Sequence, residues 1–157
     1  MSEKKAGANE PMTKQAFLIR SELKLKEGEG FLERYIKVNQ EIVEIVLKFE
    51  PQMMSFVQFF DEDKTKVSGI QLHPSAESLE FHMKTITEQM DTALLSLEYI
   101  ELAIYGPSSP GVDAFLKKVE AQGVKVDRWP IMLNGFSRFI VPPEWHKPVE
   151  QLADSKD

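Results

Sequence analysis

The chain has 157 residues, of which 42% are hydrophobic and 28% charged, with a net charge of −6 and no cysteine. This length favours one domain, and the lack of cysteine excludes disulfides, thiol chemistry and cysteine metal sites. The acidic balance argues against nucleic acid and anionic membranes as partners. The N-terminus lacks the apolar segment of a secretory signal, and no apolar run approaches the roughly 18 residues of a membrane-spanning helix, so we expect a cytoplasmic protein.

Residues 1–13 are polar with almost nothing to bury, which predicts a disordered leader. We expect a single domain over residues 14–141 and a polar tail over residues 142–157. Within the domain, residues 16–25 alternate between apolar and polar side chains, which predicts a half-buried strand. The turn Gly28-Glu29-Gly30 follows, and it is no phosphate loop because a third glycine is missing and its glutamates would repel a phosphate.

Residues 31–49 predict an amphipathic helix, because apolar side chains recur at helical spacing along one face. Asn39 lies within this apolar stripe, and a buried amide needs hydrogen-bond partners. Two interpretations of Asn39 stay open: a polar group satisfied internally or at a subunit contact, and a donor into a ligand cavity. Pro51 then prevents the helix from continuing.

Residues 53–60 and 65–73 predict a strand pair joined by a polar turn at residues 61–64. If Phe60 pairs with Thr65, then Phe56 lies opposite Gly69 and Met54 opposite Gln71, and the missing side chain of Gly69 could open space beside Phe56. Both faces of residues 53–60 are largely apolar, which predicts cover from a second layer or a second subunit.

Ser75 is the expected N-cap of the next helix, whose core stripe runs from residue 79 to residue 97. Phe81 lies far from this stripe, so it is either a lone surface aromatic or part of a partner surface. His82 lies at the margin of the stripe, where an imidazole could reach the rim of a cavity. His73 ends the preceding strand, and its nine-residue spacing from His82 does not indicate a metal site.

Residues 98–105 alternate as a further strand, followed by a loop. Ser109 before Pro110 predicts a helix start, and the helix over residues 112–122 ends at Gly123. Residues 124–129 predict a fifth strand. Residues 131–141 could add a turn or an edge strand, and Trp145 could dock the tail.

The central order of strand, helix, strand, strand, helix, strand is the split βαβ plan of ferredoxin-like α+β domains. This plan predicts an antiparallel sheet with two helices on one face. The other face needs a cover, and a twofold partner is the simplest one. The extra C-terminal helix and strand after Gly106 would extend the sheet or clasp that partner.

Residues 23–97 resemble the antibiotic-biosynthesis-monooxygenase-like group of dimeric α/β barrels. The matching segments are Gly28-Glu29-Gly30-Phe31, Glu50-Pro51-Gln52-Met53-Met54-Ser55-Phe56, Asp61-Glu62-Asp63 and Ser75-Ala76-Glu77-Ser78-Leu79-Glu80-Phe81-His82. The resemblance implies a homodimer, and it matches His82 to the helix histidine of such proteins. The usual Glu-Pro-Gly after the first helix reads Glu50-Pro51-Gln52 here, and the segment after Gly106 is longer than in short members.

That group includes cofactor-free quinol oxygenases, haem-degrading enzymes and isomerase-like members. The haem-degrading subgroup combines an asparagine, a tryptophan and a histidine, whereas Trp129 and Trp145 lie beyond the matching region of this chain. This difference argues against haem degradation, and we expect no cofactor, although the sequence does not decide whether the protein is an enzyme or whether haem or flavin binds. It leaves the substrate open as well.

The first hypothesis is a cofactor-independent monooxygenase that acts on a small quinol-like or polyphenolic molecule. His82 would be catalytic, because an imidazole can deprotonate a substrate hydroxyl near neutral pH. The expected substrate-binding residues are Asn39, Phe56, Gln71, His73 and Tyr105. The alternatives are a non-catalytic or stress-related barrel that binds a small aromatic or apolar ligand, and an interaction protein without a pocket larger than roughly 300 Å³.

Overall fold

The computed structural model describes residues 16–134. The expected leader (1–13), most of residues 131–141, and the tail (142–157) with Trp145 lie outside the described residues. The elements in chain order are β1 (Phe17–Leu25), α1 (Phe31–Phe49), β2 (Ser55–Phe60), β3 (Lys66–His73), α2 (Ala76–Thr85), α3 (Thr87–Leu94), β4 (Leu97–Tyr105), α4 (Pro110–Glu120) and β5 (Lys125–Trp129). No helix within residues 16–134 is both long enough and apolar enough to cross a membrane.

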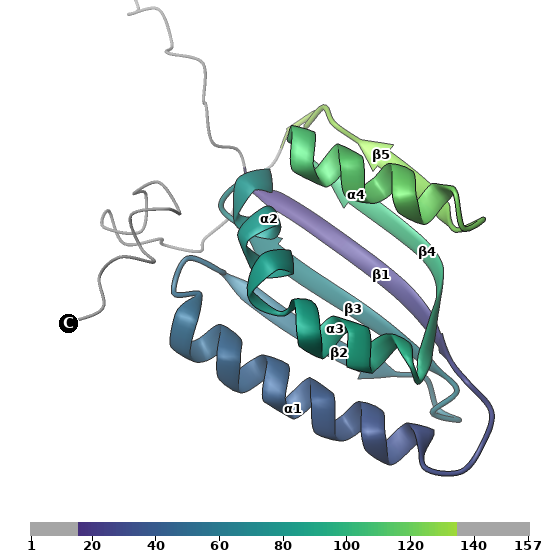
Figure 1. Cartoon of the computed structure of the whole chain (residues 1–157). Helices are drawn as coiled ribbons and strands as arrows, with labels where there is room; N and C mark the ends of the chain where they lie inside the picture. The colour runs from purple at the N-terminus through teal and green to yellow at the C-terminus, as the bar shows by residue number, and fades with distance from the viewer. Residues whose placement is uncertain (1–15, 135–157) are drawn as a thin grey trace, which may run out of the picture.

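The strands form one sheet in the order β2-β3-β1-β4-β5 (Figure 1). β1 is central and pairs antiparallel with β3 and with β4, and β2 pairs antiparallel with β3. The predicted ferredoxin-like α+β plan is therefore confirmed for these four strands. β5 instead joins β4 in parallel, because α4 forms a crossover that returns the chain to the same end of the sheet.

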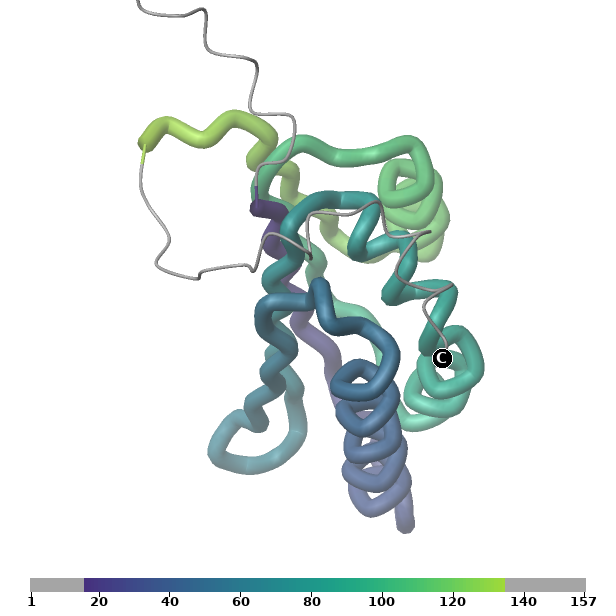
Figure 2. Tube along the Cα trace, turned by 90° about the vertical axis from the view of Figure 1, so that its left-hand side faces the viewer, coloured from purple at the N-terminus to yellow at the C-terminus, as the bar shows by residue number. Residues whose placement is uncertain are grey.

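All four helices lie on one face of the sheet, and the opposite face carries no element of the described chain (Figure 2). The strand pleat follows the alternation predicted from the sequence, with Phe17, Ile19 and Leu23 of β1 buried against the helices. The helix α1 contributes buried residues at helical spacing, namely Tyr35, Val38, Ile42 and Val46. Burial of such side chains is the main favourable term in folding this layer.

The β2–β3 hairpin has a different register from the one predicted. Phe60 pairs with Val67, so Phe56 lies opposite Gln71, and Gln58 lies opposite Gly69. The turn is longer than the sequence suggests because the Asp61 carboxylate accepts hydrogen bonds from the backbone N–H groups of Thr65 (2.7 Å) and Lys66 (3.0 Å). A Cβ atom on Gly69 would lie 2.7 Å from Ser21 Oγ, so the space that this glycine leaves is beside Ser21 and not beside Phe56.

The predicted second helix is broken at Ile86 into α2 and α3. Ile86 has φ −109° and ψ 20°, outside the helical region, and its side chain is buried. On either side of it, Thr85 Oγ1 donates to Phe81 O and Thr87 Oγ1 to Met83 O, a bonding pattern that bends helices. The prediction of one helix to residue 97 was therefore wrong. Phe81 is half-buried and not exposed.

The C-terminal additions follow the sequence closely. Ser109 caps α4 by accepting a hydrogen bond from Val112 N, and Pro110 occupies the first helical position. Gly123 ends this segment with φ +84°, a conformation that favours glycine. The pairing of Leu102 with Val126 then fixes β5 at the edge of the sheet.

Candidate functional site

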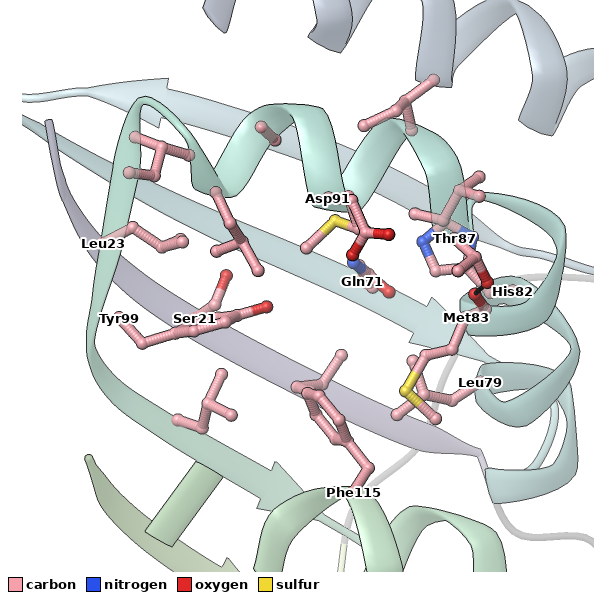
Figure 3. Close-up of a pocket in the computed structure, with 18 of the residues that line it drawn as sticks. Ser21, Leu23, Gln71, Leu79, His82, Met83, Thr87, Asp91, Tyr99 and Phe115 are labelled. Atoms are coloured by element: carbon pink, nitrogen blue, oxygen red, sulfur yellow. Dashed lines mark hydrogen bonds between the residues drawn. The ribbon is translucent and has the colours of Figure 1, made fainter. Parts of the chain in front are cut away.

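A cavity of about 460 Å³ lies between the sheet and the helical layer (Figure 3). This volume falls within the range of small-molecule sites and exceeds the limit expected for an interaction protein without a pocket. The apolar wall combines residues of the sheet with residues of the helices, including Met83 of α2, Met90 of α3 and Ile86 between these two helices. The polar side chains that line the cavity are Ser21, Tyr35, Gln58, Gln71, His82, Thr87, Asp91, Tyr99 and Lys118.

The imidazole of His82 is held by Glu50, which does not itself line the cavity. His82 Nδ1 lies 2.9 Å from Glu50 Oε1 and 3.0 Å from Oε2. The side chain of His82 is 2% exposed and that of Glu50 is 0% exposed. In the neutral imidazole the carboxylate favours the tautomer with the proton on Nδ1, and in that form Nε2 carries a lone pair. This Nε2 is buried and has no hydrogen-bond partner within the described chain.

The position of Glu50 is unfavourable for stability alone. It is the C-cap of α1, and its N–H donates to Val46 O at 2.9 Å. A negative charge at a helix C-terminus is repelled by the helix dipole, and burial of a carboxylate is costly unless it is paired. The compensation that the structure shows is the hydrogen bond to His82. A pair kept at such a cost is a candidate for function.

His73 lies behind the cavity wall at the end of β3. Its Nδ1 is 2.9 Å from Ser78 Oγ, and its Nε2 is 3.1 Å from Gln71 Oε1. Burial, together with a smaller effect of the nearby His82, lowers the pKa of His73 to about 3. His73 is therefore neutral near pH 7. The ring centroids of His73 and His82 are 5.9 Å apart, so the two imidazoles form one buried cluster.

A second polar group lies at the other end of the cavity. Figure 3 shows the hydroxyl groups of Ser21 and Tyr99 at this end and His82 at the opposite end. Burial raises the pKa of Tyr99 to about 12 and also raises that of Tyr35, so both phenols stay protonated near neutral pH. Tyr35 donates its hydroxyl proton to Gln58 Oε1. The cavity therefore presents polar side chains at both ends.

The structure brings together three of the six residues predicted for the site. Phe56, Gln71 and His82 line the cavity. His73 is outside the lining but bonds to Gln71. The catalytic and binding roles of these residues stay predictions.

Asn39 and Tyr105 are not brought to the cavity. Asn39 is half-buried and its Oδ1 has no partner within the described residues, but Tyr35 and Ile42 of the same helix form that part of the cavity wall. Tyr105 belongs to the opposite face, because the strand pleat turns its neighbour Ile104 inward. Tyr105 stacks there on Trp129, with ring centroids 6.2 Å apart.

Sequence reasoning missed Glu50 and the polar residues Ser21, Gln58 and Tyr99. Glu50 had a readable signal, because it lies four residues after Val46 and thus continues the apolar stripe of α1. Gln58 was hidden by the register error in the hairpin. In the described part of the chain, no group of three or more His, Asp or Glu side chains could hold a metal ion.

The sequence matches no protein-family model and no curated protein. Comparison of structures gives clear matches. MupZ from Pseudomonas fluorescens has a TM-score of 0.62 at 15% identity and covers 82% of this chain and 99% of its own. A conserved protein of unknown function from Bacteroides thetaiotaomicron, described as a possible oxidoreductase, has a TM-score of 0.50 at 16% identity and covers 59% of this chain and 97% of its own.

The matching structures also include SnoaB, a cofactor-independent oxygenase from Streptomyces nogalater, with a TM-score of 0.49 at 5% identity over 60% of this chain and 94% of its own. At such identities the likeness concerns the fold alone. The chain has an α+β, ferredoxin-like fold, and its likeness to MupZ extends over most of that fold. The match to MupZ covers 82% of this chain, which is a larger share than the residues up to Gly106 make up. The match therefore extends into the C-terminal addition.

Proposed function

We propose that this protein is a cofactor-independent oxygenase acting on a small quinol-like or polyphenolic molecule. The observation that carries the proposal is the buried Glu50–His82 pair, whose free Nε2 belongs to a residue lining an apolar cavity of about 460 Å³. A carboxylate that orients an imidazole with a free nitrogen is the arrangement of a general base. The polar atoms at both ends of the cavity support a ligand with oxygens on opposite sides of a ring.

The proposed reaction needs only the substrate and dioxygen. His82 Nε2 takes the proton of a ring hydroxyl, and the Glu50 carboxylate compensates the charge that forms on the imidazole. The electron-rich phenolate transfers an electron to dioxygen, and the two radicals combine to form a carbon–oxygen bond. The proton on His82 then returns to the peroxide, and loss of water leaves a carbonyl. In total, a quinol and one dioxygen give a hydroxyquinone and one water.

The test is oxygen uptake with a panel of quinols, corrected for the uptake without enzyme. The wild-type protein is compared with His82→Ala and His82→Gln, because glutamine can still donate a hydrogen bond to Glu50 but cannot take up the proton. We expect turnover to fall by about 10²–10⁴-fold in both variants. Equal rates in wild type and variants would exclude His82 as the base. Binding of quinols without any turnover would instead identify a ligand-binding barrel.

We further propose that the protein is a homodimer joined through the open face of the sheet. Because Phe56 and Gln58 line the cavity, the pleat of β2 turns Val57 and Phe59 to the opposite face, where they are 39% and 57% exposed. The stacked pair Tyr105 and Trp129 lies at the edge of the same face. A second copy would cover these side chains, and a stable interface of about 1,200–2,000 Å² requires such a surface.

Light scattering in dilute buffer tests the dimer. The wild-type chain should have twice the chain mass, and Phe59→Lys should shift it to the single-chain mass because burial of an ammonium group in the interface costs free energy. A wild-type protein that remains a single chain at micromolar concentration would contradict the homodimer. The cytoplasmic location stays a prediction from the sequence.

A further inference from the structure

Gln71 is the polar residue of the cavity wall whose orientation is fixed from behind. Its Oε1 lies 3.1 Å from His73 Nε2, on the side of the buried cluster. No other hydrogen bond of the Gln71 side chain is present within residues 16–134. The amide nitrogen is thus left as a donor in the wall of the cavity.

His73 bonds to both Gln71 and Ser78, and the direction of these two hydrogen bonds follows from the neutral state of His73. A neutral imidazole has one N–H group and one lone pair. Because Gln71 Oε1 can only accept, His73 Nε2 must be the donor. His73 Nδ1 then accepts the hydroxyl proton of Ser78, 2.9 Å away. Ser78, His73 and Gln71 form a relay that ends in an N–H₂ group with free donors.

Gln71 and His82 both line the cavity, and their free side-chain nitrogens have opposite hydrogen-bonding character. His82 Nε2 is an acceptor, because Nδ1 carries the ring proton and donates its N–H to Glu50. Gln71 Nε2 is a donor, because Oε1 is occupied by His73. An ionisable hydroxyl matches such a pair: it gives its proton to His82, and the negative charge that remains on the conjugated ligand is stabilised by the amide donor.

We infer that Gln71 is the residue that selects the ionised form of an aromatic hydroxyl, and that Ser78 and His73 are positioning residues that keep its amide donor turned toward the ligand. The inference deepens the proposed function. It rests on that function because it assumes that the cavity binds a phenol-like molecule. The ligand class is narrowed to acidic phenols and enols with conjugated oxygens. Neutral ethers and ketones of the same shape bind without this preference.

Other charged groups near the ligand do not account for such a preference. Tyr35 and Tyr99 stay protonated because burial raises the pKa of each. Asp91 of α3 and Lys118 of α4 are exposed lining residues of opposite charge. Their effects on an anion oppose each other and are screened by solvent. The Glu50 carboxylate repels an anion, and the proton that His82 takes from the ligand hydroxyl compensates this charge.

The test uses 4-nitrophenol, because its ionised and neutral forms differ in absorbance and its binding requires no turnover. We expect the apparent pKa of the bound probe to be lower than that of the free probe in wild type. In Gln71→Leu, which is similar in size and lacks donors, the ionised form should bind roughly tenfold more weakly or worse, since a hydrogen bond to a charged group is lost. Binding of 4-nitroanisole, which cannot ionise, should change little.

Ser78 variants test the positioning relay. Ser78→Ala removes the hydroxyl that His73 accepts from, so we expect a roughly threefold weaker binding of the ionised probe. Ser78→Thr keeps the hydroxyl and should restore the wild-type preference. If the role of Ser78 were purely structural, both variants would have a lower melting temperature. The apparent pKa of the bound probe would then be the same in the two variants.

The inference is overturned if Gln71→Leu, shown by circular dichroism to be folded, binds the ionised probe as tightly as wild type does. Failure of wild type to bind the probe would overturn it as well. Failure of the proposed function is a separate result, because it appears as absent oxygen uptake while the ionisation of the bound probe still depends on Gln71.

Discussion

Replacing Glu50 with glutamine tests the pair at the centre of the candidate site with the least change in shape. The carboxylate is 0% exposed and accepts from His82 Nδ1 at 2.9 and 3.0 Å. In Glu50→Gln the side chain keeps its size, but the amide can donate its N–H to Nδ1. The imidazole can then carry its proton on Nε2, the nitrogen that must stay free to act as a base.

The expected loss of activity is large and the expected loss of stability is small. Without the correct tautomer the general-base contribution of about 10²–10⁴-fold disappears, which corresponds to about 3–5 kcal/mol of transition-state stabilisation. Stability should change by about 1 kcal/mol or less, because removing a buried charge at a helix C-terminus offsets the weaker hydrogen bond. Glu44→Gln is the matched control, since Glu44 is an exposed glutamate of the same helix.

Two measurements separate the effect on chemistry from an effect on folding. Oxygen uptake with a quinol gives kcat/KM, and urea denaturation gives the free energy of unfolding. Nitrogen NMR of the imidazoles reports the tautomer directly, and the chain has only three histidines. Wild-type turnover in Glu50→Gln, or an unchanged Nδ1–H tautomer of His82, would refute the reasoning. A loss of stability with unchanged turnover would show that the pair is structural.

The other predictions concern stability. Burial lowers the pKa of His73 from 6.5 to about 3. Below pH 6.5, the unfolded chain therefore binds a proton at His73 that the folded chain does not bind. The free energy of unfolding should therefore fall by about 2 kcal/mol between pH 6.5 and pH 5. Urea denaturation measures this free energy, and it should depend more steeply on pH in wild type than in His73→Leu. A Cβ on Gly111 would clash with the carboxylate of Glu80. Gly111→Ala should therefore break the hydrogen bonds that Ser109 Oγ and Gly111 N donate to Glu80. We expect the free energy of unfolding to fall by about 1–2 kcal/mol. Thermal denaturation checks this value, and Glu80→Ala should make Gly111→Ala nearly neutral; additive losses in the double variant would contradict the clash.

Several features of the fold were predictable because they depend on neighbours in sequence. The alternation in β1 and the stripe of α1 each repeat a local geometry that side-chain polarity reveals. Ser109 before Pro110 marks the start of α4, and the positive φ of Gly123 marks its end, for reasons confined to one turn of chain. The order of these elements then restricted the topology to the ferredoxin-like plan.

The candidate site depended on contacts that no local pattern specifies. Glu50 and His82 are 32 residues apart and meet only because α1 and α2 lie on the same face of the sheet. The hairpin register was set by the side chain of Asp61, and a shift of two residues decided which of Gln58 and Phe56 lies opposite Gly69. The sequence alone thus determined the strands, the helices α1 and α4, and His82 as a candidate. Tertiary packing decided the break between α2 and α3, the partner of His82, its free nitrogen and the amide donor of Gln71, because hydrogen bonds between distant residues form only after the layers have assembled.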